Sequence, residues 1–168
     1  QNWLQPYKLH ISVVLDYNGH VAIDLSDAEY LLNNIKNTLV ILQGDGGFRS
    51  QECIDLLKAS GIVVTNTPFS LFREYVAQLI LYEKKFIIIG NQNAITYKEI
   101  FPLIKNNLIW LGASIHSGDR EFQVPDSYPL NAAACRIEEK GKKDIRVKGI
   151  RWFTNLDYRQ RHEELLLY

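Results

Sequence analysis

The sequence has few of the residues that mark disulfide-rich, metal-binding or membrane proteins. It contains only two cysteines, Cys53 and Cys135, which stand far apart, so we expect no disulfide scaffold and a reducing, cytoplasmic setting. Its four histidines are scattered and form no metal-ligand cluster, so we expect no zinc or iron site. No apolar run approaches the ~20 residues that span a bilayer and no signal-peptide pattern opens the chain, so we expect no membrane association.

The composition is that of an ordinary globular domain. The 168 residues are 46% hydrophobic and 23% charged, and this length allows one substantial core. We therefore expect a single domain over residues 1–168. The formal net charge is zero, so the chain as a whole carries no basic footprint for nucleic acid.

Short apolar runs alternate with helix-like stretches along most of the chain. An Asn-Gly pair at residues 18–19 predicts a hairpin of residues 9–16 and 21–25. The later pattern predicts buried strands separated by helices, hence βαβ crossovers and a doubly wound, mainly parallel α/β sheet. The predicted strands are 38–42, 62–65, 86–89, 108–111 and 146–153, and the predicted helices are 28–35, 51–59, 71–82 and 97–104. The predicted helix caps are Ser26 or Asp27, Ser50, and Thr67 or Ser70.

The most informative motif is Asn66-Thr67-Pro68-Phe69, directly after the apolar run 62–65. An adenine amine is a poor nucleophile because its lone pair is delocalised into the ring. Two acceptors aimed at its N–H bonds, an Asn side-chain oxygen and a main-chain carbonyl, would favour a pyramidal nitrogen, and a nearby aromatic ring can stack on an extruded base. Taken alone, the four residues favour a structural turn, because Asn and Pro dominate turns for backbone reasons.

Four longer segments point to a family. They are IVVTNTPFSLFREYV at 62–76, FIIIGNQNAITYKEIF at 86–101, IRWFTNLD at 150–157 and GDGGFRSQE at 44–52. Taken in their order along the chain, they resemble the adenine-specific DNA methyltransferases of the EcoRI type, from about residue 38 to the end of the chain. The family usually carries Asn-Pro-Pro-Phe and an acidic residue before the loop phenylalanine, so Thr67 and Gly47 depart from its pattern.

The resemblance implies a Rossmann-like domain that uses S-adenosylmethionine and acts on double-stranded DNA. Asn66 and the Thr67 carbonyl would accept hydrogen bonds from the adenine amine, Pro68 would stiffen the turn, and Phe69 would stack on the flipped base. In-line displacement at a sulfonium methyl needs no metal. Because Asn66 ends a predicted central strand of an open sheet, the site is expected outside the carboxyl ends of the strands.

The loop 44–48 also follows a predicted strand. Gly-Asp-Gly-Gly is equally typical of an ordinary tight loop. The resemblance favours a cofactor site, in which Asp45 accepts a hydrogen bond from the adenine amine of S-adenosylmethionine and Phe48 stacks on that ring.

Basic residues are concentrated near the end of the chain. Residues 136–162 hold nine Lys or Arg against four Asp or Glu, whereas the remainder holds ten against fifteen. The run 140–143 alone has the composition of a solvated turn, but the basic segment 136–162 as a whole favours phosphate contact. Residues 112–145 are predicted to be an irregular, target-recognition-like segment. The predicted DNA-binding residues are Arg120, Lys142, Lys143, Arg146, Lys148 and Arg151.

Two features lead us to expect an N-terminally incomplete domain. The chain begins at Gln1 rather than at a methionine. The resemblance also implies a glycine-rich cofactor loop before the catalytic motif, and we expect it upstream of Gln1.

The predicted function is methyl transfer from S-adenosylmethionine to the exocyclic amine of adenine in duplex DNA, with a cognate restriction endonuclease as an expected partner system. Two alternatives stay open. One is a methyltransferase for protein Gln or Asn side chains, because a planar amide poses the same chemical problem. The other is a non-catalytic DNA-binding remnant, which Thr67 and Gly47 would permit.

Asn91 and Asn93 follow the predicted strand 86–89. They are either turn residues or residues that line the active site.

Overall fold

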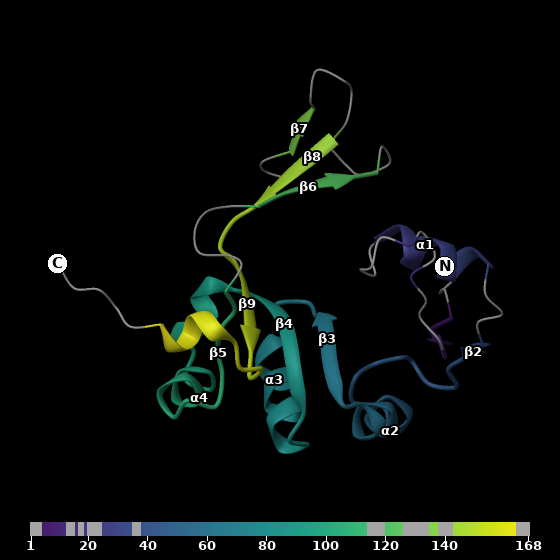
Figure 1. Ribbon diagram of the computed structural model, residues 1–168. Helices are drawn as coiled ribbons and strands as arrows, with labels where there is room; N and C mark the ends of the chain where they lie inside the picture. Colours follow the sequence, from purple (N-terminus) through teal and green to yellow (C-terminus); the bar gives the residue numbers. More distant parts are fainter. Residues whose placement is uncertain are drawn as a thin grey trace. The chain divides into compact units, whose positions relative to one another are not determined.

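The computed structural model describes residues 5–12, 16, 19, 25–34, 38–113, 120–125, 135–137 and 143–163 (Figure 1). The chain forms two compact units, residues 1–58 and 59–168. Among the described helices, none has both the length and the apolar character to cross a membrane.

The first unit contains β1 (Tyr7–His10), α1 (Leu25–Asn34), β2 (Thr38–Ile41) and nearly all of α2 (Gln51–Ala59). β1 pairs antiparallel with β2, and Leu25, the last residue of the predicted hairpin, belongs to α1. Most of the predicted second strand, residues 21–24, lies outside the described residues. The predicted caps of α1, Ser26 and Asp27, lie inside its first turn instead.

Two further predictions for this unit have opposite outcomes. The bounds of α2 are confirmed, and Ser50 caps it, because its Oγ accepts a hydrogen bond from the Cys53 N–H at 3.3 Å. The prediction that β2 is buried is wrong within this unit, since Leu39 and Ile41 are 59% and 55% exposed. β2 pairs only with β1 among the described strands, and burial of both faces requires layers that these residues do not supply.

The second unit is built on a four-stranded mixed sheet. Its strands are β3 (Ile62–Asn66), β4 (Lys85–Asn91), β9 (Ile150–Thr154) and β5 (Trp110–Leu111), in that order across the sheet. β3 and β4 are parallel, whereas β9 runs antiparallel to both β4 and β5. An α/β arrangement is therefore present, and among the described strands this sheet is mixed rather than mainly parallel, with β3 as an outer strand rather than a central one.

α3 (Phe72–Leu81) connects the two parallel strands and covers one face of the sheet (Figure 1). Its predicted apolar stripe is confirmed, because Phe72, Val76 and Leu79 are buried. Phe72 packs on Phe153, and Phe86 and Ile88 of β4 are buried as well. Full burial of such side chains contributes about 1.5–3 kcal/mol each. The predicted cap is wrong: the N-cap position is Leu71, and no side chain caps the helix.

The segment after β4 is less helical than predicted. η1 (Gln92–Thr96) is a 3-10 helix, and α4 covers only Phe101–Lys105. The next predicted strand shortens to β5. Ile100 and Ile109 are fully buried, so this segment is fixed by its apolar contacts more than by regular structure.

The predicted irregular segment contains strands, which corrects the prediction for residues 112–145. β6 (Arg120–Val124), β8 (Lys143–Val147) and β7 (Cys135–Ile137) form an antiparallel sheet in the order β6-β8-β7. The predicted strand 146–153 is divided between β8 and β9 by a turn at Lys148 and Gly149. Gly149 has φ +66°, which glycine adopts without the strain of a side chain.

Candidate active site at the end of strand β3

The Asn66-Thr67-Pro68-Phe69 motif follows the last paired position of β3. Asn66 pairs with Ile89 of β4, and the two parallel strands end at the same edge of the sheet. Ligands of open α/β sheets bind outside such carboxyl ends. The predicted position of Asn66 at the end of its strand is therefore confirmed, although β3 is an outer strand of the sheet rather than a central one.

The backbone of the motif is fixed by the start of α3. The Leu71 N–H donates to the Pro68 carbonyl at 2.9 Å, and the Phe72 N–H donates to the Phe69 carbonyl at 3.3 Å. Phe72 packs edge-to-face on Phe153, with ring centroids 5.0 Å apart. These contacts anchor the turn to the core three residues after the aromatic residue of the motif.

The side chains of the motif face outward. Asn66 is exposed, Phe69 is 38% exposed, and Thr67 is half-buried. No hydrogen bond joins the Asn66 amide to another residue in the described part of the chain. An acceptor oxygen and an aromatic ring are thus both accessible to a ligand at this edge.

The loop after β2 is held by its own acidic residue. Asp45 Oδ1 accepts a hydrogen bond from the Gly47 N–H at 2.8 Å, and the Arg49 guanidinium lies 4.6 Å from the centroid of the Phe48 ring. Gly46 has φ +68°, and a Cβ there would stand 2.6 Å from Pro6 Cβ, so the loop requires glycine at this position. These contacts account for the loop structurally, and a cofactor role for Asp45 and Phe48 stays a prediction.

Sequence reasoning missed a second carboxylate at this loop. Glu52, in the first turn of α2, accepts a hydrogen bond from the Gln43 N–H through Oε2 at 3.0 Å. Its position in the first helical turn was a readable signal, because acidic side chains are favoured there. Glu52 closes the loop from the helix side.

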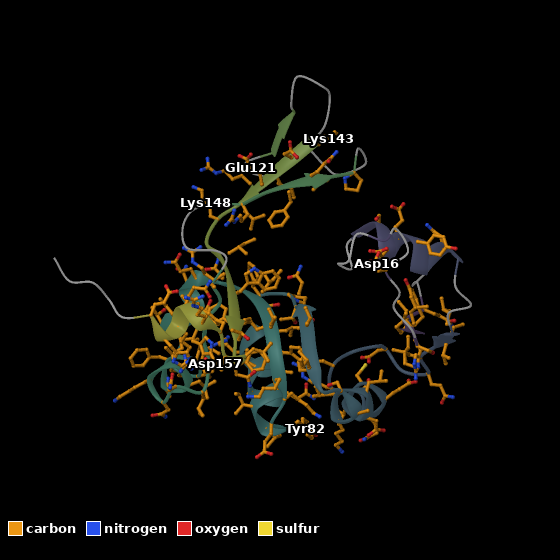
Figure 2. The ribbon with its side chains drawn as sticks, in the orientation of Figure 1. Asp16, Tyr82, Glu121, Lys143, Lys148 and Asp157 are labelled. Carbon is orange, nitrogen blue, oxygen red and sulfur yellow. The ribbon has the colours of Figure 1, made fainter. Side chains whose placement is uncertain are left out.

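The predicted DNA-binding residues do not share one surface. Register and side-chain alternation place Arg120 and Lys143 on one face of the β6-β8-β7 sheet, and Arg146 opposite Glu121 on the other face. Lys148 is exposed in the turn between β8 and β9 (Figure 2). Lys142 lies outside the described residues.

Arg151 is in a different environment from these residues. Its side chain is buried, with 7% exposed, and its NH1 donates to the Ile150 carbonyl at 2.8 Å. A buried guanidinium does not contact phosphate from this position, so we leave Arg151 out of the DNA surface proposed below.

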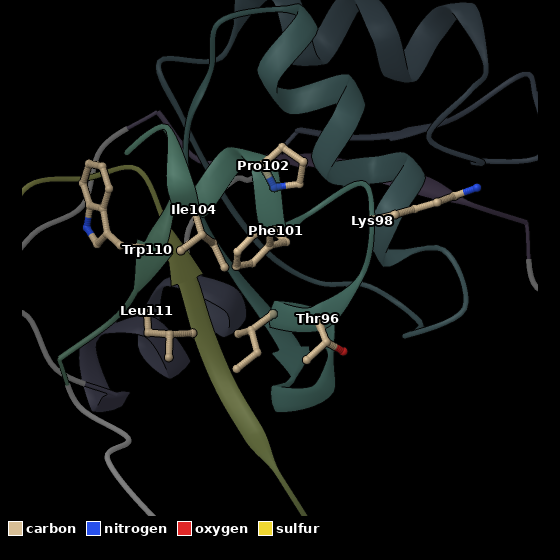
Figure 3. Close-up of a pocket in the computed structure, with 8 residues that line it drawn as sticks. Thr96, Lys98, Phe101, Pro102, Ile104, Trp110 and Leu111 are labelled. Carbon is tan, nitrogen blue, oxygen red and sulfur yellow. The ribbon is translucent and has the colours of Figure 1, made fainter.

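A separate apolar pocket of about 660 Å³ lies between η1, α4 and β5 (Figure 3). Its lining includes Ile95, Phe101, Ile104 and Trp110, with Lys98 as its charged residue. It contains none of the predicted site residues and no carboxylate or amide that could accept from an adenine amine. It is therefore distinct from the candidate site.

A polar cluster covers the outer side of β5. The Arg161 guanidinium stacks on Trp110 at 3.6 Å from the ring centroid, and it bonds to Asn107 and to Asp157. His162 Nε2 bonds to both carboxylate oxygens of Asp157, at 2.7 and 2.9 Å. The hydrogen bond from His162, assisted by Arg161, lowers the pKa of Asp157 below its ordinary value.

Comparison with known proteins decides the family. The family model described as "Adenine-specific methyltransferase EcoRI" matches residues 1–168. The chain belongs to this family. The resemblance expected from the four sequence segments is thus confirmed.

Curated relatives agree with this assignment. The chain is 56% identical to the type II methyltransferase M.EcoRI of Escherichia coli over 124 residues, which cover 74% of this chain and 38% of that protein. It is 40% identical to the type II methyltransferase M.MpnI of Mycoplasma pneumoniae over 121 residues, 71% of this chain and 38% of that protein. M.MgeORF184P of Mycoplasma genitalium is 38% identical over 136 residues, 79% of this chain and 43% of that protein. No solved structure matches significantly.

The chain spans about two fifths of the length of these curated relatives. Residues 1–168 include the Asn66-Thr67-Pro68-Phe69 motif, the helix α3 that follows it and the strands around it. The activity of the whole protein is therefore a proposal.

Proposed function

We propose that the protein is a DNA methyltransferase that transfers a methyl group from S-adenosylmethionine to the exocyclic amine of adenine in duplex DNA. One observation carries the proposal. In a chain that matches the EcoRI methyltransferase family from end to end, Asn66 and Phe69 stand exposed at the carboxyl end of β3, on a backbone fixed by α3.

The roles of the motif follow from the chemistry of the amine. The Asn66 side-chain oxygen and the Thr67 carbonyl would accept the two N–H bonds of a flipped adenine, while Phe69 stacks on its ring. The amine nitrogen becomes more positive as it acquires a methyl group, so both hydrogen bonds strengthen in the transition state. Acceptors that already stand in place lower the barrier without reorganisation, and correct positioning of the base supplies much of the rest.

S-adenosylmethionine, when bound, supplies a methyl group on a sulfonium centre with a neutral thioether as leaving group. The Asp45 loop has suitable chemistry for part of this cofactor. Asp45 uses Oδ1 to hold the Gly47 N–H, and a carboxylate has further acceptor sites for an adenine amine at Oδ2. Phe48 offers an aromatic ring three residues after Asp45 in the same loop, and Arg49 already lies over the ring.

The proposed DNA contacts are electrostatic and come from the β6-β8-β7 sheet and its turn. Arg120 and Lys148 are exposed, Lys143 is half-buried on the sheet face of Arg120, and Lys142 adjoins Lys143 in sequence. Arg146 is exposed on the opposite face and is therefore left out of this surface. Because phosphate contacts position a duplex without reading its sequence, these cations would set register rather than recognition.

The decisive experiment is a methyl-transfer assay with the full-length protein and S-adenosylmethionine labelled in its methyl group. The acceptors are duplex DNA, the same DNA with target adenines replaced by purine lacking the amine, and a mixture of Gln- and Asn-containing peptides. We expect label in N6-methyladenine of the first DNA only. Label in peptide amides, or none in any acceptor, would overturn the proposal.

Thr67 allows the non-catalytic alternative to be tested directly. A main-chain carbonyl is present whatever the residue, and Pro68 already restricts the preceding residue to extended geometry, so Thr67 still presents its carbonyl. We therefore expect the protein with Thr67 to be active and Thr67→Pro to change turnover only modestly. An inactive protein that gains activity on Thr67→Pro would identify a decayed motif.

A further inference from the structure

Asn66 is the last residue of β3 and Asn91 is the last residue of β4. Because the two strands are parallel, both residues lie at the carboxyl end of the sheet. Asn66 pairs with Ile89, two residues before Asn91, and side chains alternate along a strand. Asn66 and Asn91 therefore face the same side of the sheet, whereas Gly90 faces Phe72 on the opposite side. A spacing of about 4.8 Å between strands and about 3.3 Å per residue puts the two Asn Cα atoms roughly 8 Å apart, within reach of one base.

The orientation of the Asn91 amide is fixed by the backbone that follows it. Its side-chain oxygen accepts a hydrogen bond from the Asn93 N–H at 2.9 Å and caps η1. Because a backbone N–H only donates, the atom that faces it must be the oxygen, and the NH₂ group takes the other position. That NH₂ lies 3.7 Å from where a Cβ of Gly149 would stand, and the Gln92 N–H binds the Gly149 carbonyl at 2.6 Å.

The two amides therefore present complementary groups at one edge. Asn66 contributes an accessible acceptor, and Asn91 a half-buried donor whose oxygen is already engaged. An adenine presents the matching pattern, because its amine donates while the adjacent ring nitrogens, N1 on one side and N7 on the other, accept. Guanine has an acceptor oxygen in place of the amine, so it has no donor there for the Asn66 oxygen.

We propose that the Asn91 side-chain NH₂ donates a hydrogen bond to the ring nitrogen next to the amine of the target adenine. This inference rests on the proposed function, and it adds a substrate-binding residue from β4 to the motif of β3. Asn91 would fix the rotation of the base within its own plane, so that the amine meets the Asn66 oxygen and the Thr67 carbonyl. Stacking on Phe69 would fix the orientation of that plane.

The test combines one variant with two substrate analogues, in the full-length protein. Asn91→Asp keeps an oxygen for the Asn93 N–H but removes the donor, so η1 stays capped. Gln92→Glu makes the same amide-to-acid change at the next, exposed residue and serves as its control. Each protein is assayed on duplexes whose target base is adenine, 1-deazaadenine or 7-deazaadenine, and thermal unfolding confirms that each is folded.

We expect wild type and Gln92→Glu to lose about tenfold to a hundredfold in kcat/KM on one of the two analogues, which identifies the nitrogen that is bound. Asn91→Asp should be slower by a similar factor on adenine and lose nothing further on that analogue. Such non-additivity is the signature of a direct contact and would not arise from a structural role.

Several outcomes would overturn the inference. Wild-type rates that are unchanged on both analogues would do so even if Asn91→Asp failed to fold. Equal losses on an analogue for wild type and Asn91→Asp would assign the contact to another residue. If the wild-type protein methylates adenine and Asn91→Asp does so at the same rate, only this inference is wrong. If the wild-type protein methylates no adenine, the proposed function is wrong as well.

Discussion

At the scale of single residues, the candidate site combines an accessible side chain with an inaccessible support. The side chains of Asn66 and Phe69 are exposed, but the carbonyl groups of Pro68 and Phe69 accept hydrogen bonds from two N–H groups at the start of α3. Substitutions of the exposed side chains should therefore change chemistry more than folding. Two predictions belong to this scale.

The first concerns the motif itself. Asn66→Ala in the full-length protein should lower kcat by at least about 10²–10³-fold, because it removes an acceptor that strengthens in the transition state. DNA affinity should hardly change, since phosphate contacts dominate it. Phe69→Ala should weaken base binding by roughly 1–3 kcal/mol, the usual contribution of stacking. Single-turnover kinetics and filter binding measure both effects, and near-normal turnover by Asn66→Ala would return the motif to an ordinary turn.

The second concerns pH. His162, and then Arg161, hold the pKa of Asp157 below its ordinary value of 3.8, so folding is favoured by the ionised carboxylate. This contribution is complete above pH 3.8 and is lost as the pH falls through 3.8 and the lower folded pKa. Asp157→Asn should be less stable than wild type near neutrality, and the difference should vanish in acid. Denaturant midpoints across this range check it, and a pH-independent difference would show that the ion pair is not its cause.

The residues that the sequence predicted well are those whose role is local. Asn66 at a strand end and Ser50 as a cap depend on neighbours within a few positions. Arg151 was misjudged because its burial depends on strands and helices distant in sequence. Glu52 was overlooked because its bond to Gln43 joins two residues nine positions apart, across a loop of unknown path.

At the scale of elements, α3 is the support of the site. The sequence predicted it within one residue at each end, because its apolar residues recur at helical spacing. What the sequence did not predict is the close approach of α3 to β4. Gly90 makes that approach possible: a Cβ there would stand 2.5 Å from Phe72 Cε2 and 2.9 Å from Phe153 Cε2.

Gly90→Ala should therefore push the start of α3 away from the sheet. We expect a loss of about 1–3 kcal/mol in unfolding free energy, the usual effect of overpacking a core, and a fall in turnover as the motif shifts. Gly61→Ala is the matched control, because a Cβ at Gly61 meets nothing within 4 Å. Urea denaturation compares the two, and equal effects would show that Phe72 adapts without cost.

At the scale of the whole molecule, strand order is the feature that sequence patterns leave open. Apolar runs indicated most of the strands, but β9 inserts between β4 and β5 although it follows them by about 40 residues or more in the chain. Pairing over such distances depends on tertiary contacts, so the parallel sheet inferred from alternating elements was wrong for β9 and β5. The same limit applies to residues 120–147, whose strands pair only with one another among the described residues.

The last prediction concerns how the molecule meets DNA. If Arg120 and Lys148 each neutralise one phosphate, replacing either by Ala should weaken binding to all duplexes alike and reduce the slope of log K against log salt by about one. Lys85→Ala is the control. Lys85 is the first residue of β4, so it lies at the amino end of the parallel strands, whereas Asn66 lies at their carboxyl end. Affinities of the full-length protein measured from low to physiological salt give the slopes. A base held at Asn66 places its own backbone phosphates near that edge, so the slope should respond to Lys148 and not to Lys85. A slope that falls with Lys85→Ala but not with Lys148→Ala would place the duplex at the other edge of the sheet, where Asn66 could not reach a flipped base.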